Sequence, residues 1–306
     1  MKQYLVAAAA LALLAGCGSG GTDAAAGSPG GTSISVVATT PEVADFVRHI
    51  AGGDVRVTQV IKPNVDPHEY EPTPADIQAI GQAQLVVKNG VGLEAWLDQT
   101  IRSAGFKGSV VDSSQGVELR KGDPGDEEMK DGDPHIWHNP LNAKIMVTNI
   151  EKGLAAADPA HASAYAANLT SYSAKLDQLD ADNEAAYAKI PAEQRKLVTN
   201  HDAFGYYVDR YKLTFVGSVI PSMDTSAELS GQQLTELVAK IKATGTKAIF
   251  TESSLPPKTA EAIAKQAGVK VIGGEDALFG DSLGPDGSYL EAEQHNTQVI
   301  TSALAG

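Results

Sequence analysis

The segment 159–190, near the middle of the chain, contains no Gly and, after Pro159, no Pro. Asp158 and Pro159 supply an N-cap and a first-turn proline, with which helices commonly begin. The large apolar side chains that follow fall largely on a spacing of three or four residues, which places them on one face of an α-helix. They are Tyr165, Leu169, Tyr172, Leu176, Leu179, Tyr187 and Ile190. At about 1.5 Å per residue the helix would be roughly 45–50 Å long, enough to run the length of two domains.

Short β-rich runs alternate with amphipathic stretches on both sides of this segment. Before it, we expect strands at Ile34–Ala38, Val55–Ile61, Leu85–Lys88 and Ser109–Val111, and helices at Pro41–Ile50, Pro74–Gln82 and Leu93–Ala104. After it, we expect strands at Lys196–Thr199, Thr214–Val219, Ala248–Thr251 and Val269–Ile272, and helices at Ser230–Ala243, Pro257–Gln266 and Gly287–Leu304. Such alternation indicates parallel βαβ units. The sequence therefore predicts an α/β fold with two lobes, 34–158 and 191–306, each with a parallel sheet, joined by one rigid helix, 159–190.

The N-terminal residues predict export. The apolar run Leu5–Gly16 is shorter than the roughly 20 residues that span a bilayer. We therefore interpret residues 1–16 as a signal peptide rather than a transmembrane helix. The small residues before Cys17, the single cysteine of the chain, resemble a bacterial lipobox, which implies cleavage before Cys17 and a diacylglycerol on its thiol. Residues 17–33 are rich in Gly, Ser, Ala and Thr and predict a flexible tether. We therefore expect an extracytoplasmic protein, lipid-anchored to the bacterial membrane at the cell surface or in the periplasm.

The formal net charge of −14 limits the classes of partner. Nucleic acid binding needs Lys and Arg side chains to neutralise phosphates, so we expect no nucleic acid partner. An acidic protein concentrates cations near its surface, which is compatible with a cation ligand. We expect the protein to be a monomer.

Three histidines and one aspartate lie in turn-rich segments separated by 67, 66 and 80 residues: His68, His135, His201 and Asp281. Groups so far apart can share a site only if the fold brings distant loops together. His68, His201 and Asp281 each follow a predicted strand, where open α/β folds place their ligands. Imidazole nitrogens with one carboxylate oxygen suit a borderline transition metal such as Zn²⁺. The sequence therefore predicts a Zn²⁺ site in a cleft between the two lobes.

The motifs around these residues resemble those of the zinc- and manganese-binding substrate-binding proteins of ABC importers. They occur in the family's order: D-P-H-E-Y-E-P at 66–72, D-P-H-I-W at 133–137, H-D-A-F-G-Y at 201–206 and D-S-L-G at 281–284. The resemblance implies that the three histidines and the aspartate are the metal ligands. It also implies that the partner is an ABC permease and that a long helix links two α/β lobes.

The chain departs from the family pattern in two places. After Trp137 the family usually has an apolar residue followed by Asp, whereas this chain has His138 and Asn139. His138 is three residues from His135 and is a candidate for a group that orients a ligand, for an alternative ligand or for a bystander; we favour the bystander. The second departure is the segment Glu118–Asp133, which lacks the His-rich insertion of zinc-specific members and has seven acidic and three basic residues. We expect a disordered, solvated loop there, with weak cation collection as the alternative.

Metal identity is predicted from the donor types. Members of the family that resemble manganese binders often have Glu at the third position, where this chain has His201. Three imidazoles and one carboxylate favour Zn²⁺, with the harder Mn²⁺ as the alternative.

We expect no enzymatic activity, because four protein ligands leave no vacant tetrahedral position for a reacting water. The sequence also has no H-E-x-x-H or Walker phosphate-loop motif. A surface adhesin and, least favoured, an exported zinc hydrolase are the other candidate functions.

Overall fold

The computed structural model describes residues 33–305 except 122–128, 224, 228 and 285–286. The predicted signal peptide, Cys17 and all of the tether but Ser33 lie outside the described residues. The residues from Ser33 onward form one compact unit. Within the described part of the chain, no helix is long and apolar enough to cross a membrane.

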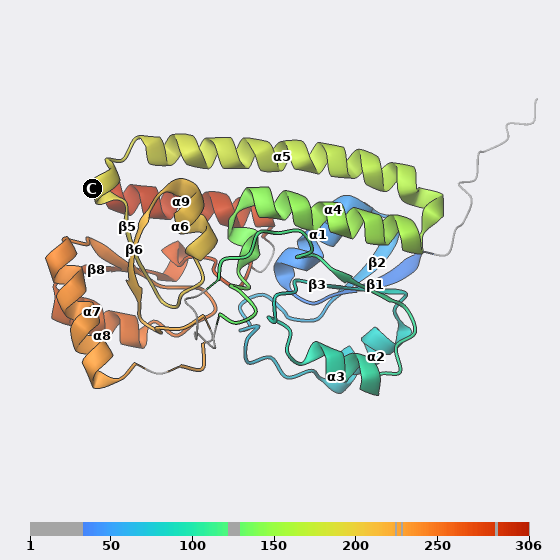
Figure 1. Cartoon of the computed structure of the whole chain (residues 1–306), viewed down its shortest axis with the longest axis horizontal. Coiled ribbons are helices and arrows are strands. Elements are labelled where there is room, and N and C mark those ends of the chain that lie inside the picture. The colour runs from blue at the N-terminus through green and yellow to red at the C-terminus, as the bar shows by residue number, and fades with distance from the viewer. Residues whose placement is uncertain (1–32, 122–128, 224, 228, 285–286, 306) are drawn as a thin grey trace, which may run out of the picture. The chain divides into compact units, whose positions relative to one another are not determined.

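The first half of this unit is built on a four-stranded parallel sheet (Figure 1) with the strand order β2-β1-β3-β4. The strands are β1 (Ile34–Ala38), β2 (Val55–Gln59), β3 (Leu85–Lys88) and β4 (Ser109–Asp112). Alternate residues of β1 point to opposite faces, as the pleat of a strand requires. Val36 and Ala38 enter a core covered by α1 (Pro41–Ala51) and α4 (Pro140–Ala157), while Val37 faces α2 (Pro74–Gln82) and α3 (Leu97–Ser103).

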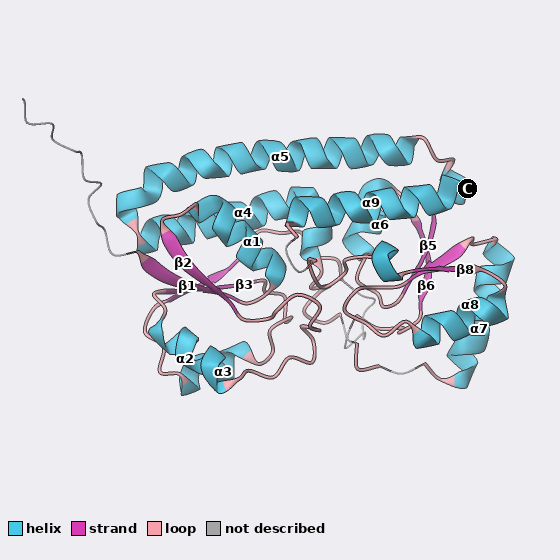
Figure 2. Cartoon of the chain, turned by 180° about the vertical axis from the view of Figure 1, so that it is seen from behind, coloured by secondary structure: helices cyan, strands magenta, loops and turns pink. Residues whose placement is uncertain are grey.

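The second half contains two parallel strand pairs, β5-β6 and β7-β8, with β5 next to β7. The strands are β5 (Lys196–Thr199), β6 (Thr214–Ser218), β7 (Ala248–Phe250) and β8 (Lys270–Ile272). The helices α7 (Gly231–Thr244) and α8 (Lys258–Ala267) cover one side, and α6 (Gly205–Tyr211) lies on the other. Figure 2 shows the two sheet regions at opposite ends of the unit, with loops meeting between them.

Two long helices contribute side chains to both halves. The helix α5 (Ala162–Ala188) follows a 3-10 turn at Pro159–His161 and runs along the whole unit (Figure 1). Its Tyr165 lies in the core of the first half and its Tyr187 in that of the second. The C-terminal helix α9 (Tyr289–Ala305) does the same, because Tyr289 packs in the first core and Leu304 in the second. The two halves are therefore joined by buried contacts along both helices.

The observed fold confirms the predicted α/β class and its parallel sheets. Seven of the eight strand predictions end within one residue of the observed ends, and the β2 prediction runs two residues too far. The helices α4 and α6 were not predicted, because α4 begins shortly after one ligand motif and α6 begins within another, and we interpreted both regions as loops. The start of α4 carries recognisable signals, with Asn139 as N-cap accepting from the Leu141 amide and Pro140 in the first turn.

Candidate metal centre

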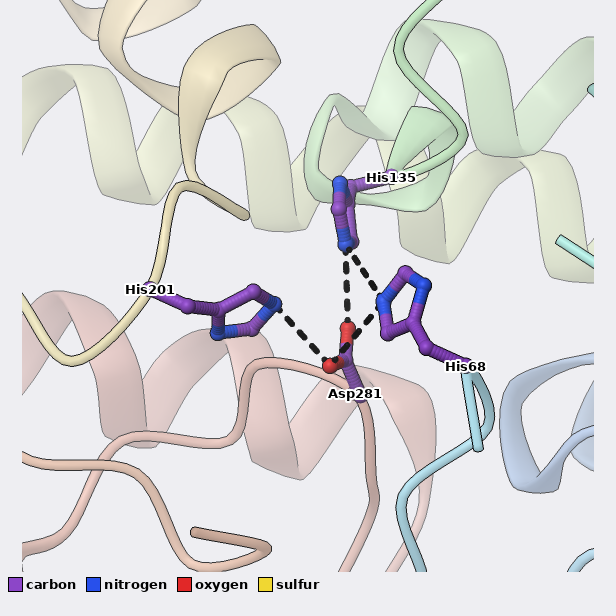
Figure 3. Close-up of side chains that lie close together, drawn as sticks. All are labelled: His68, His135, His201 and Asp281. Carbon is purple, nitrogen blue, oxygen red and sulfur yellow. Dashed lines mark hydrogen bonds and ion pairs between the residues drawn. The ribbon is translucent and has the colours of Figure 1, made fainter. Parts of the chain in front are cut away.

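The four predicted ligands converge on one another from separate segments of the chain (Figure 3). One ligand atom from each of His68, His135, His201 and Asp281 lies within 4.8 Å of the others. His68 lies on the loop after β2, His201 directly after β5, and Asp281 on the loop after β8. His135 immediately precedes the 3-10 turn at Ile136–His138. The parallel strands thus deliver three of the four residues from their carboxyl ends, as the fold class predicts.

The spacing of the donor atoms suits one metal ion. The His68 and His135 Nε2 atoms are 3.2 Å apart. The Asp281 carboxylate oxygens lie 3.5 Å from His68 Nε2, 3.3 Å from His135 Nε2 and 3.0 Å from His201 Nε2. A tetrahedral zinc ion with ligands about 2.0 Å away has donor atoms about 3.3 Å apart. The donor set therefore fits such an ion with little adjustment.

Three of the four ligand residues are buried, and two of these present atoms without a hydrogen-bond partner among the described residues. His135 and His201 are 0% exposed and Asp281 is 1% exposed. Within the described ranges of the chain, His201 Nε2 and both Asp281 carboxylate oxygens have no hydrogen-bond partner. Buried polar atoms are normally satisfied, because an unpaired one costs about 1–3 kcal/mol. Several such atoms aimed at one point indicate that a cation completes the site.

His68 is the one ligand of the four that is not fully buried. It lines a cavity of about 210 Å³ together with Gly92, Asp131, Pro134 and Met223, among others. A larger cavity of about 630 Å³, near α1 and β2, includes none of the four ligands. The smaller cavity therefore borders the candidate metal centre at His68.

Two buried carboxylates orient the imidazoles of His135 and His201. Asp133 Oδ1 lies 2.8 Å from His135 Nδ1 and accepts from the His135 amide at 3.0 Å. Glu252 Oε1 lies 2.9 Å from His201 Nδ1 and accepts from the His201 amide, also at 2.9 Å. A carboxylate that receives the Nδ1 proton leaves the Nε2 lone pair for a metal. Both rings are therefore fixed with Nε2 toward the centre.

The close approach of Glu252 depends on a neighbouring glycine. A Cβ atom at Gly280 would lie 2.0 Å from Glu252 Oε2, so no larger residue fits there beside Glu252. The carbonyl of Gly280 accepts from Trp137 Nε1 at 3.2 Å, and the Trp137 carbonyl accepts from the Tyr289 hydroxyl at 2.6 Å. The loop that carries Asp281 is thus tied to the His135 segment and to α9.

The electrostatics of the ion-free site favour charged histidines. Burial lowers the pKa of His135, but the Asp281 and Asp133 carboxylates outweigh it and raise the pKa to about 9. The pKa of His201 is raised well above its usual value, because Glu252 and Asp281 outweigh the opposing effect of burial. Burial raises the pKa of Asp281, but His201 and His135 hold it well below its ordinary range. Protons therefore occupy the positions that a metal cation would take.

His138 does not belong to the group of four. It is fully buried, and its Nδ1 lies 2.7 Å from Glu293 Oε1 in α9. Its ring stacks on Phe204, with ring centroids 4.5 Å apart. The structure thus places His138 in the packing between the two halves rather than at the donor atoms.

The sequence reasoning missed the role of Glu252 and did not single out Asp133. Glu252 lies two residues beyond β7, at the carboxyl end of a strand, which is the same signal that located His201. The expected disordered loop is wrong for the described ends of Glu118–Asp133. The Asp133 amide donates to the Arg120 carbonyl at 3.0 Å, and the Asp133 side chain is 0% exposed. Residues 122–128 of that segment lie outside the described residues.

Comparison with known proteins places the chain among metal-binding proteins. A family model described as the zinc-uptake complex component A, periplasmic, matches residues 36–303. The manganese ABC transporter substrate-binding lipoprotein PsaA of Streptococcus mitis is 32% identical over 304 residues, which cover 96% of this chain and 95% of that protein. The manganese-binding lipoprotein MntA of Bacillus subtilis is 33% identical over 314 residues, 99% of this chain and 100% of that one. The solved periplasmic zinc-binding protein TroA of Treponema pallidum matches with a TM-score of 0.82 at 31% identity, covering 89% of this chain and 99% of that chain.

Proposed function

Because the chain belongs to the family of metal-binding substrate-binding proteins of ABC importers, we propose that it captures Zn²⁺ outside the cytoplasm and delivers it to a permease. Proteins of this family carry a substrate to an importer and are not enzymes, so the metal ion is the cargo. The four proposed ligands are His68, His135, His201 and Asp281. The observation that carries the proposal is the convergence of these four ligand groups. Three of the residues are buried, and the facing atoms of His201 and Asp281 have no hydrogen-bond partner among the described residues.

The preference for Zn²⁺ is argued from the donors. Three imidazole nitrogens and one carboxylate suit zinc better than manganese, which prefers oxygen ligands. Mn²⁺ is the second candidate, because the relatives PsaA and MntA are named for manganese whereas TroA is named for zinc. One geometric feature also favours Mn²⁺, because both Asp281 oxygens face the site: Oδ1 is 3.3 Å from His135 Nε2 and Oδ2 is 3.0 Å from His201 Nε2. A carboxylate that offers both oxygens supplies the additional oxygen ligand that Mn²⁺ favours.

Cys17 is the proposed attachment point of a lipid anchor. The lipobox-like residues before it and the relatives named as lipoproteins support this assignment. We further propose that residues 17–33 act as the tether and that the protein works as a monomer. A surface adhesin is a different proposal, and loss of metal-dependent growth on deletion of the gene would distinguish transport from adhesion.

The test is metal titration by calorimetry on the chain from Ser33 onward, which contains the complete compact unit. After chelator treatment, Zn²⁺ and Mn²⁺ are titrated separately and then in competition. We expect one Zn²⁺ per chain and much weaker binding of Mn²⁺. Tighter binding of Mn²⁺ would overturn the zinc assignment and leave the receptor function intact. No stoichiometric binding of either ion would overturn the function itself.

A further inference from the structure

Arg120 connects a histidine of the metal centre to the other half of the protein. Its Nη1 donates a hydrogen bond to Asp133 Oδ2 at 2.7 Å. The other oxygen of that carboxylate, Oδ1, is the one that lies 2.8 Å from His135 Nδ1. Its Nε donates to Asp209 Oδ2 in α6 at 2.8 Å. One guanidinium therefore reaches a carboxylate of the first half and a carboxylate of the second.

The surroundings of Arg120 are shaped to hold it. The Tyr206 hydroxyl accepts a hydrogen bond from the Arg120 amide at 3.0 Å and donates one to the Asp133 carbonyl at 3.1 Å. A Cβ atom at Gly205 would lie 1.6 Å from Arg120 Nη1, so the guanidinium fills the space that a side chain there would need. The backbones of Arg120 and Asp133 are also joined by a hydrogen bond, which the Asp133 amide donates to the Arg120 carbonyl at 3.0 Å. These contacts fix both the backbone and the side chain of Arg120.

We propose that Arg120 is a positioning residue of the metal site, which holds Asp133 against His135 and ties both to α6. The inference rests on the proposed function, since its consequence is a change in metal affinity. Nothing in the four ligand motifs includes Arg120, because it lies in the acidic segment before D-P-H. Arg is suited to this position because its planar fork donates from two edges to two partners, which a lysine ammonium cannot reproduce in the same geometry.

The two contacts are expected to contribute unequally. The Asp133 side chain is 0% exposed, so removal of Arg120 leaves a buried carboxylate with one donor fewer. The Asp209 side chain is 62% exposed, and solvent screens that contact. The interaction through Asp133 should therefore dominate the effect on affinity.

The experiment measures Zn²⁺ affinity by chelator competition in four variants of the Ser33 chain and the wild type. For Arg120→Gln we expect a loss of about 10–100-fold, the usual range when a group that orients a metal ligand is removed. We expect an intermediate loss for Arg120→Lys and less than about fivefold for Asp209→Asn. Arg102→Gln, at an exposed arginine of α3, is the matched control and should bind as the wild type does.

A second readout separates positioning from general stability. Co²⁺ alone is bound to the same proteins and its visible absorption spectrum recorded, because the bands report the ligand geometry around the ion. We expect altered bands in Arg120→Gln and unaltered bands in Arg102→Gln. Wild-type affinity and spectrum in Arg120→Gln would overturn the inference while leaving the receptor function in place. If that variant fails to fold, Arg120→Lys decides, and wild-type behaviour there would overturn it equally. Failure of the wild type to bind either ion would overturn the proposed function and the inference with it.

Discussion

Metal affinity should rise steeply with pH in a range where free histidine no longer titrates. Asp281 and Asp133 overcome the effect of burial and raise the pKa of His135 to about 9 in the ion-free protein, against an ordinary value of about 6.5. At pH 7 only about one molecule in a hundred then has a neutral His135, because two pH units correspond to a factor of about 100. A metal must displace this proton, and about half of the molecules have a neutral His135 at pH 9, so apparent affinity should increase about 50-fold between pH 7 and pH 9.

His201 adds to the effect, because its pKa is also raised, chiefly by Glu252 and Asp281 against the opposing effect of burial. The assay is Zn²⁺ binding under chelator competition from pH 6 to 9, with calorimetry in buffers of different ionisation enthalpy to count the protons released. We expect about two protons released per ion near pH 7.5, one from each of these histidines. His161→Gln, at a histidine in the 3-10 turn before α5, is the control and should leave the profile unchanged. Constant affinity above pH 7, with no proton release, would refute the reasoning, because histidines of ordinary pKa are already neutral there.

Three further outcomes follow from the same contacts. Glu252→Gln should weaken metal binding about 10–100-fold in calorimetry, since the Nδ1 proton of His201 loses its charged acceptor; unchanged affinity would contradict that role. The ion-free protein should lose stability as pH rises from about 6.5 through 9, because the raised pKa of His135 in the folded state stabilises the fold below the unfolded-state pKa, and this contribution is lost above the folded-state pKa. Thermal unfolding with chelator present measures this stability, and an increase over the same pH range would contradict the expected sign. His138→Ala should lower the free energy of unfolding by about 1–3 kcal/mol, because Glu293 loses its buried partner, yet it should reduce Zn²⁺ affinity far less than His135→Ala does; the reverse order would show that the second ligand is misassigned.

The four proposed metal ligands could be predicted from the sequence, but the carboxylate of Glu252, which orients His201, could not. His68, His135, His201 and Asp281 stand in short motifs whose residues also form the local loop, so the pattern carries their position. Glu252 has no such motif. Its role depends on Gly280, which leaves room for its carboxylate beside the loop of Asp281, and this juxtaposition exists only in the folded chain.

The same distinction applies to the fold. The strands and α5 were predictable, because periodicity is a local property of the sequence. The participation of α9 in both cores was not, since the pattern of the helix shows that one face is buried but not what covers it. Tyr289 lies against Phe46 of α1, with ring centroids 4.8 Å apart. These two residues are in contact although they lie near opposite ends of the described sequence.

Charge balance connects the orientation of the ligands to the exchange of cargo. In the ion-free site the raised pKa values of His135 and His201 place two protons beside the three carboxylates of Asp133, Glu252 and Asp281. A divalent cation that displaces those two protons leaves the total charge of the buried cluster unchanged, and the guanidinium of Arg120 against Asp133 offsets the remaining negative charge in both states. Because a change of net charge in a buried site is costly, an exchange that conserves charge lets one arrangement of side chains accommodate both the empty and the loaded protein. The carboxylates that orient the imidazoles for the metal are thus also the groups that hold the protons in its place, so affinity and pH dependence cannot be altered independently at this site.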